Sequence, residues 1–140
     1  MKSAIKGKDG VLVTLGSHNY FSTDRTCSEG TKQIISAMKE TGVNRIVVLS
    51  SYGAGPGNRP LLSWFVRNLL NYILEDKDVQ EDLIINSGLD YTIVRPPRLV
   101  NKPAKGAIYE TTATSNTKLP TMEISRADVA AFMLQSMVNK

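Results

Sequence analysis

The sequence contains little cysteine, histidine or aromatic residue. Its 140 residues include one cysteine, Cys27, one histidine, His18, and only 6% aromatic residues. A single thiol cannot form an intramolecular disulfide, and the chain has no metal-ligand spacing, so we expect neither a disulfide framework nor a metal site. This cysteine usage suits a reducing compartment, and we expect a cytoplasmic protein.

Long hydrophobic runs are also absent. No stretch approaches the roughly 18 apolar residues of a membrane-spanning helix, and residues 1–6 lack the apolar core of a secretory signal. We therefore expect no membrane partner. Gly and Pro residues are scattered along the chain, which predicts an ordered globular domain.

The charge pattern is mildly positive and dispersed. The net charge is +4, and the lysines and arginines form no block. A nucleic-acid-binding protein would show a basic stripe with aromatic side chains for base stacking, whereas most aromatic residues here lie in apolar segments. We therefore expect no nucleic-acid partner, and we interpret the charge as suited to an anionic small-molecule ligand.

Three short apolar runs stand out: Val11–Leu15, Ile46–Leu49 and Tyr91–Val94. Each contains β-branched residues and lies between turn-forming residues, and none alternates with polar residues. This pattern predicts strands that are buried on both faces. Pro96 and Pro97 end the third run, because proline cannot extend a central hydrogen-bonded ladder.

Segments with helical periodicity lie between and after these runs. The capping-box pattern of residues 26–29 opens a first helix that ends at Gly42. The similar pattern of residues 125–128 opens the last helix. Both helices carry one apolar stripe. The stripe residues are Cys27, Ile34, Ile35 and Met38 in the first helix, and Val129, Phe132, Met133 and Met137 in the last.

The middle of the chain is less regular. Apolar pairs from Leu61 to Leu74 predict a helix with a wide apolar face, which charges at Glu75–Asp78 then interrupt. A further helical stretch passes through Val79 to Ile84. Weak alternation predicts short edge strands at Ala107–Thr114 and Met122–Ile124.

The order of strands and helices predicts the fold class. Strand, helix, strand, helix, strand at this spacing implies a parallel sheet with right-handed crossovers. Because the strands have no polar face, helices must cover both sides of the sheet. We therefore predict one α/β domain over residues 1–140, with a doubly wound, three-layer α/β/α arrangement.

An ordered set of motifs resembles the atypical short-chain dehydrogenase/reductases, the NAD(P)H-binding group, and within it the biliverdin reductase B (flavin reductase-like) and NmrA-like proteins. The resemblance extends from about Gly7 to about Val138. Its motifs are Leu15-Gly16, Ser28–Thr31, Ala37–Lys39, Gly42–Arg45, Ser50–Gly53, Ser87–Pro96 and Ser125–Ala130.

The resemblance implies the C-terminal portion of a Rossmann fold. In that family the fold begins with a strand and a glycine-rich turn that presents backbone N–H groups to the pyrophosphate. Here the first strand resembles the family's fourth, so we expect an N-terminally truncated NAD(P)-binding domain. The glycines of residues 53–57 have the wrong spacing for this turn, and Pro56 has no N–H to donate. Val11–Leu15 then becomes an exposed edge, which predicts self-association.

The resemblance also implies site residues. Leu15, Gly16 and Ser17 would border the adenosine and ribose side of the cofactor, and Ser50 would hold the nicotinamide. Ser51 would be catalytic, beside the nicotinamide and the acceptor. The backbone of Pro96 and Pro97 would border the nicotinamide, and Arg98 would meet a phosphate or an acceptor carboxylate. An equally favoured alternative is that Arg98 is a surface residue with no role in ligand binding.

Lys77 matches the catalytic lysine of the family by its spacing to Ser87-Gly88, but Ile73 stands four residues earlier, where active members have a tyrosine. Tyr72 is one position away, about 100° around a helix. We therefore expect hydride transfer from NADPH (or NADH) to a flavin or similar planar acceptor, which needs little acid–base help. The alternatives are a non-catalytic NmrA-like cofactor-sensing or partner-binding module and an inactive remnant.

Overall fold

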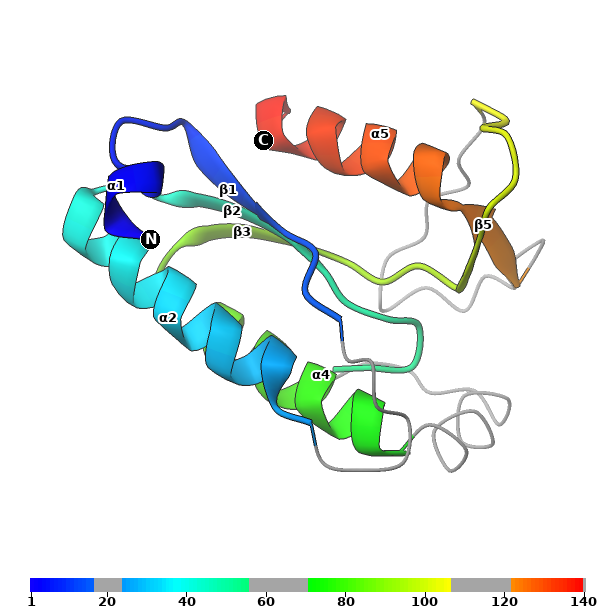
Figure 1. Cartoon of the computed structure of the whole chain (residues 1–140), viewed down its shortest axis with the longest axis horizontal. Coiled ribbons are helices and arrows are strands. Elements are labelled where there is room, and N and C mark those ends of the chain that lie inside the picture. The colour runs from blue at the N-terminus through cyan, green and yellow to red at the C-terminus, as the bar shows by residue number, and fades with distance from the viewer. Residues whose placement is uncertain (17–23, 56–70, 107–121, 140) are drawn as a thin grey trace.

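A parallel three-stranded sheet runs through the centre of the molecule (Figure 1). The computed structural model describes residues 1–16, 24–55, 71–106 and 122–139. The strands are β1 (Gly10–Val13), β2 (Arg45–Leu49) and β3 (Asp90–Val94), in the spatial order β1-β2-β3. Both pairs are parallel, which confirms the three apolar runs as strands of one sheet. Their predicted burial on both faces holds for β2 but is wrong for β1 and β3, where Leu12 and Tyr91 are exposed because these strands form the edges of the described sheet.

Helices cover both faces of this sheet, as Figure 1 shows. α2 (Thr26–Thr41) and α4 (Asn71–Ile85) pack on one face, together with the short α1 (Lys2–Ile5), and α5 (Arg126–Val138) packs on the other. The core of the first face includes Met38, Ile46 and Ile84, and that of the second includes Val47 and Met133. The predicted doubly wound α/β/α arrangement is therefore confirmed.

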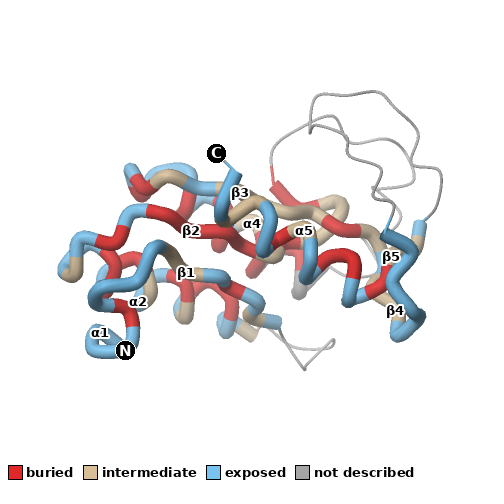
Figure 2. Tube along the Cα trace, turned by 90° about the horizontal axis from the view of Figure 1, so that it is seen from above, coloured by how far each residue is buried: buried red, intermediate tan, exposed pale blue. Residues whose placement is uncertain are grey.

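The central strand β2 is the most deeply buried element. Ile46, Val47 and Val48 are fully shielded from solvent, and Figure 2 shows this strand inside the molecule. Alternate residues of β2 face opposite layers, so that Ile46 and Val48 contact the first core and Val47 the second. This two-sided burial explains why the run carries no polar alternation.

The boundaries of the helices partly match the prediction. Gly42 ends α2 in the left-handed conformation, with φ of 73°, and the amide of Val43 closes the turn on Met38 O. α4 runs without a break through Glu75–Asp78, so the predicted interruption is wrong. The predicted segments Leu61–Leu70 and Ala107–Thr114 lie outside the described residues.

A small second sheet follows β3. β4 (Arg98–Val100) pairs in parallel with β5 (Glu123–Ser125). β5 is shifted by one residue toward the C-terminus relative to the predicted strand Met122–Ile124. Ser125 then begins α5 as its N-cap, because its hydroxyl accepts a hydrogen bond from the amide of Asp128 at 2.9 Å. Within the described ranges, no helix combines the length and hydropathy that crossing a bilayer requires.

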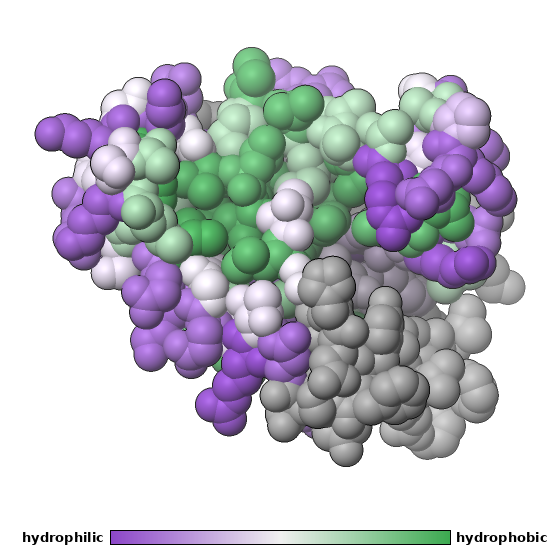
Figure 3. All heavy atoms as spheres, in the orientation of Figure 1, coloured by the Kyte–Doolittle hydropathy of each residue, from purple (hydrophilic) through white to green (hydrophobic). Residues whose placement is uncertain are grey.

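β1 forms an edge of the sheet. Among the residues that the structure describes, it pairs with β2 alone, and Leu12 on it is 39% exposed. Figure 3 shows hydrophobic atoms gathered over β1 and toward α5. On α5, Leu134 and Val138 are also exposed, at 58% and 81%. An apolar edge strand of this kind can pair with another chain.

We therefore expect the purified protein to self-associate through β1. The substitution Leu12→Lys should weaken this association, because a charged side chain on an edge strand opposes strand pairing. Light scattering over a range of protein concentrations measures the effect. Val79→Lys, at an exposed position of α4, should leave the association unchanged. A wild-type protein that stays monomeric at high concentration would contradict this expectation.

Candidate functional site

The segments that follow β2 and β3 lie side by side beyond the sheet. The amide of Ser50 donates to Val94 O at 2.8 Å, and the amide of Tyr52 donates to Pro96 O at 2.9 Å. These bonds continue the pairing of the two strands past their carboxyl ends. In open α/β sheets, ligands bind outside this edge. The structure thus brings Ser50, Ser51 and Pro96 together at the edge where the sequence predicted the site.

Ser50 carries an unusual hydroxyl group. The residue is 5% exposed, and its Oγ has no hydrogen-bond partner among the described residues. Leaving a buried hydroxyl unpaired costs about 1–3 kcal/mol, so such groups in folded proteins call for an explanation. A bound ligand with a polar atom at this edge would supply the missing partner.

Lys77 of α4 joins the ends of β1 and β2. Its Nζ donates to Leu15 O at 2.9 Å, to Leu49 O at 2.8 Å and to Gln80 Oε1 at 2.9 Å. The side chain is buried, and this burial lowers the pKa of Lys77, while the nearby Cys27 and the carboxylates of α4 act in the opposite direction. The two strand ends are therefore tied to one buried ammonium.

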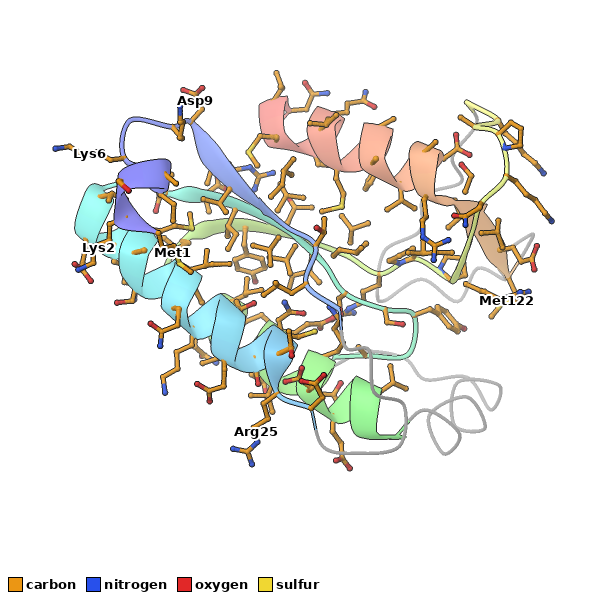
Figure 4. All side chains as sticks on the ribbon, in the orientation of Figure 1. Met1, Lys2, Lys6, Asp9, Arg25 and Met122 are labelled. Atoms are coloured by element: carbon orange, nitrogen blue, oxygen red, sulfur yellow. The ribbon has the colours of Figure 1, made fainter. Side chains whose placement is uncertain are left out.

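Asp76 of α4 caps the start of α2. Its carboxylate accepts hydrogen bonds from the amides of Cys27 at 2.8 Å and Ser28 at 3.0 Å. The sequence predicted that residues 26–29 would cap themselves, but the N-cap is Arg25, whose side chain makes no capping bond and points into solvent in Figure 4. The local pattern was wrong because a carboxylate from a neighbouring helix takes these orphan amides.

A buried ion pair fixes the segments after β2 and β3. Glu81 is fully buried and binds Arg95 through two contacts, with Nε at 3.0 Å from Oε1. Gly55 lies directly on this pair, because a Cβ there would stand 1.8 Å from Glu81 Oε2. The amide of Gly55 donates to Asp78 Oδ1 at 2.7 Å. Only glycine fits here, where φ is +71°.

Leu15 and Gly16 follow β1 at the same edge. The Leu15 side chain packs on Gly30 of α2, where an added Cβ would lie 2.5 Å from Leu15 Cδ1. No described atom lies within 4 Å of a Cβ placed on Gly16. Pro97 follows the buried Pro96 and is half-buried. Ser17, His18 and the side chain of Tyr72 lie outside the described residues.

Arg98 begins β4 and points to the surface. Its side chain is 75% exposed and forms an ion pair with Glu123 at 2.5 Å, while its amide donates to Met122 O. Lys102 binds the same carboxylate at 2.9 Å. These contacts place Arg98 in a surface network with β5, and its contact with a cofactor phosphate remains a prediction.

Most of the supporting residues were not predicted from the sequence. The polar positions Asp76, Lys77, Gln80 and Glu81 recur at helical spacing along one side of α4. That spacing could have indicated a buried polar face, but the charges were interpreted as an interruption. Arg95 and Gly55 carried no local signal, because their partners are distant in the sequence.

The fold and the strand-end site define a Rossmann-type dinucleotide-binding domain. The family model of NAD(P)H-binding proteins matches residues 1–140. The chain therefore belongs to this NAD(P)H-binding family, which confirms the resemblance carried by the sequence motifs.

Curated relatives cover nearly the whole chain. It is 30% identical over 141 residues to the uncharacterized sugar epimerase YhfK of Bacillus subtilis, covering 99% of this chain and 61% of the relative. It is 25% identical over 142 residues to the UPF0659 protein YMR090W of Saccharomyces cerevisiae, covering 97% and 59%. The chain thus spans about three fifths of the length of these relatives.

Solved structures share the fold. A putative NAD-dependent epimerase/dehydratase from Bacillus halodurans has a TM-score of 0.75 and 25% identity, covering 99% of this chain and 62% of that one. ChuY, an anaerobillin reductase from Escherichia coli O157:H7, has a TM-score of 0.70 and 21% identity, covering 99% and 61%. At this identity, the second likeness shows the fold alone.

Replacement of Asp76 tests the cap of α2. Asp76→Ala leaves two buried amides without an acceptor, and we expect it to lower the free energy of unfolding by about 1–3 kcal/mol. Urea unfolding followed by circular dichroism measures this loss. Asp82→Ala, at an exposed position of the same helix, should change the stability far less. Equal effects of the two substitutions would contradict the cap.

The thiol of Cys27 should react slowly in the folded protein. It is 1% exposed, and burial raises its pKa, so both access and thiolate formation are suppressed. The folded state holds the thiol proton more firmly than the unfolded chain. The Cys27 contribution to stability is therefore full below the unfolded pKa of about 8.5 and falls as the pH rises above it.

Labelling with a chromogenic disulfide reagent checks this expectation. The rate for the native protein should stay far below the rate in denaturant, and it should rise with urea as the protein unfolds. Labelling of the native protein at the rate of the unfolded chain would show that Cys27 is accessible.

Proposed function

We propose that the chain is an NAD(P)H-dependent oxidoreductase domain that transfers hydride from the nicotinamide to a flavin or similar planar acceptor. Family membership supports nicotinamide binding. The observation that carries the proposal is the buried Ser50 hydroxyl without a described partner, at the edge where the segments after β2 and β3 meet. The buried Cys27 suits a cytoplasmic setting.

In this proposal, residues at the different strand ends contact different parts of the NAD(P)H cofactor. Leu15, Gly16 and Ser17 border the adenosine and ribose, and the lack of a side chain at Gly16, where no described atom lies within 4 Å of an added Cβ, allows close approach to the backbone. Ser50 donates to or accepts from the nicotinamide amide. Pro96 and Pro97 border the nicotinamide ring.

In this proposal the cofactor supplies the reacting hydride, and the protein side chains position the acceptor. The dihydronicotinamide supplies the hydride when it is bound. Ser51 is proposed to contact the acceptor. Its hydroxyl lies 3.5 Å from Tyr52 O, which is long for a hydrogen bond, so this weak internal bond can be exchanged for one to a ligand. Arg98 is proposed to meet a phosphate or carboxylate by exchanging its exposed pairing with Glu123. NADPH is preferred over NADH by family analogy.

A non-catalytic cofactor-sensing module is the second candidate. The observation that favours it is Ile73, which stands four residues before Lys77 in α4, where active relatives in the family have a tyrosine. A module of this kind would bind NADPH and reduce nothing. Measuring binding and turnover separately distinguishes the two functions.

Titration of the whole chain with NADPH, followed by calorimetry, tests the proposal. We expect saturable binding, and Ser50→Ala should weaken it by about tenfold, because one lost hydrogen bond is worth about 1.4 kcal/mol. Ser36→Ala, at an exposed position of α2, should bind as the wild type does. The absence of saturable binding at millimolar cofactor would overturn the proposal.

The absorbance of NADPH in the presence of flavin mononucleotide then reports hydride transfer. The wild type should oxidise NADPH, and Ser51→Ala should slow the reaction more than it weakens binding. Binding without any turnover would assign the sensing function instead.

A further inference from the structure

We infer that Lys77 is a positioning residue, which holds the ends of β1 and β2 at the spacing of the site and makes no contact with the ligand. This inference rests on the proposed cofactor site for its functional meaning. It differs from the role that the family resemblance implies for Lys77, in which the lysine assists the reaction directly.

The hydrogen-bonding capacity of Lys77 is fully used. An ammonium group has three N–H donors and no acceptor. The three acceptors of Nζ are Leu15 O, Leu49 O and Gln80 Oε1, all between 2.8 and 2.9 Å. Lys77 therefore has no proton left for a ribose hydroxyl or a phenol, and with 5% exposure it has little access to solvent.

The two backbone acceptors of Lys77 lie at the carboxyl ends of β1 and β2. Leu15 lies two residues after the end of β1, and Leu49 is the last residue of β2. Both residues are half-buried, and a carbonyl that turns away from solvent beyond the sheet ladder needs another partner, which Lys77 provides. The next residues along the chain are Gly16 and Ser50, which both belong to the proposed site. A shift of the ammonium would therefore move both sides of the site together.

The third acceptor fixes the lysine itself. Gln80 lies one helical turn after Lys77, and its Nε2 donates to Thr31 Oγ1 on α2 at 2.8 Å. Both Gln80 and Thr31 are fully buried. The ammonium is thus held by a chain of buried hydrogen bonds that extends to a second helix, as expected of a group that sets geometry.

Nuclear magnetic resonance of the whole, isotope-labelled chain tests this role in the wild type. In the free protein we expect a slowly exchanging Lys77 Nζ signal with hydrogen-bond couplings to the carbonyl carbons of Leu15 and Leu49. On addition of NADPH, the amides of Gly16 and Ser50 should shift, while the Nζ couplings persist. Loss of these couplings on binding would show that Lys77 turns to the ligand and would overturn the inference.

Lys77→Met provides the second measurement. It should shift the amide signals of Gly16 and Ser50 in the free protein and weaken NADPH binding by about tenfold or more. Lys39→Met, at an exposed position of α2, should do neither. Unchanged affinity for NADPH in a folded Lys77→Met protein would overturn the positioning role.

The two proposals fail in different ways. If the wild type binds no NADPH, the proposed function fails, but the Nζ couplings in the free protein and the amide shifts in Lys77→Met still decide whether Lys77 holds the strand ends. Absent couplings would overturn the inference even where NADPH binds. If Lys77→Met does not fold, the wild-type couplings with and without NADPH decide alone.

Discussion

The buried polar face of α4 is the feature on which the site depends. Asp76, Lys77, Gln80 and Glu81 are each at most 6% exposed. Burying charged groups is costly unless each is paired and hydrogen-bonded. Asp76 and Gln80 bind α2, at its start and at Thr31, Lys77 binds the ends of β1 and β2, and Glu81 binds Arg95 after β3. The free-energy cost of burying these groups is offset only when all of these hydrogen bonds and ion pairs form in the folded protein. The interactions therefore favour one arrangement of the strand ends.

A helix must supply these contacts because the strands cannot. Within the sheet, the ladder pairs the backbone groups between β1 and β2 and between β2 and β3. Most strand side chains are apolar, and the polar residues Arg45, Asp90 and Thr92 lie toward the amino end, away from the site. At the carboxyl ends the pairing of β1 with β2 stops at Val13 and Val48, while two backbone hydrogen bonds continue the pairing of β2 with β3 as far as Pro96. Lys77 of α4 joins β1 and β2 beyond that point, because its ammonium binds Leu15 O and Leu49 O.

The sequence predicted the fold well and the site only in part. The strands were predictable because each is a short run rich in β-branched residues between turn-forming residues, although only β2 is buried on both faces. Gly42 marked the end of α2 through its backbone conformation. Ser50 and Pro96 were predictable because each follows the end of a strand. Asp76 and Glu81 were missed because their partners lie 14 to 49 residues away, and a local pattern cannot distinguish a solvated charge from one that is buried and paired.

The two ends of β2 differ in a way that favours the carboxyl edge as the ligand site. At the amino end, Arg45 binds Asp90, Thr92 and the carbonyl of Ser136 on α5. Its Nε has no partner among the described residues, but the space is filled: a Cβ on Gly10 would lie 2.5 Å from Met137 Sδ and 2.8 Å from Arg45 O. At the carboxyl end, Ser50 has an unpartnered hydroxyl in the described part of the chain, and a Cβ placed on Gly16 would meet no described atom within 4 Å. The unpaired Nε of Arg45 lies in a region that described side chains fill, whereas no described atom fills the space at Gly16, whose neighbour Leu15 is linked to the end of β2 through Lys77. This contrast between the two ends of β2 supports the proposal that a ligand binds at the carboxyl end of the sheet.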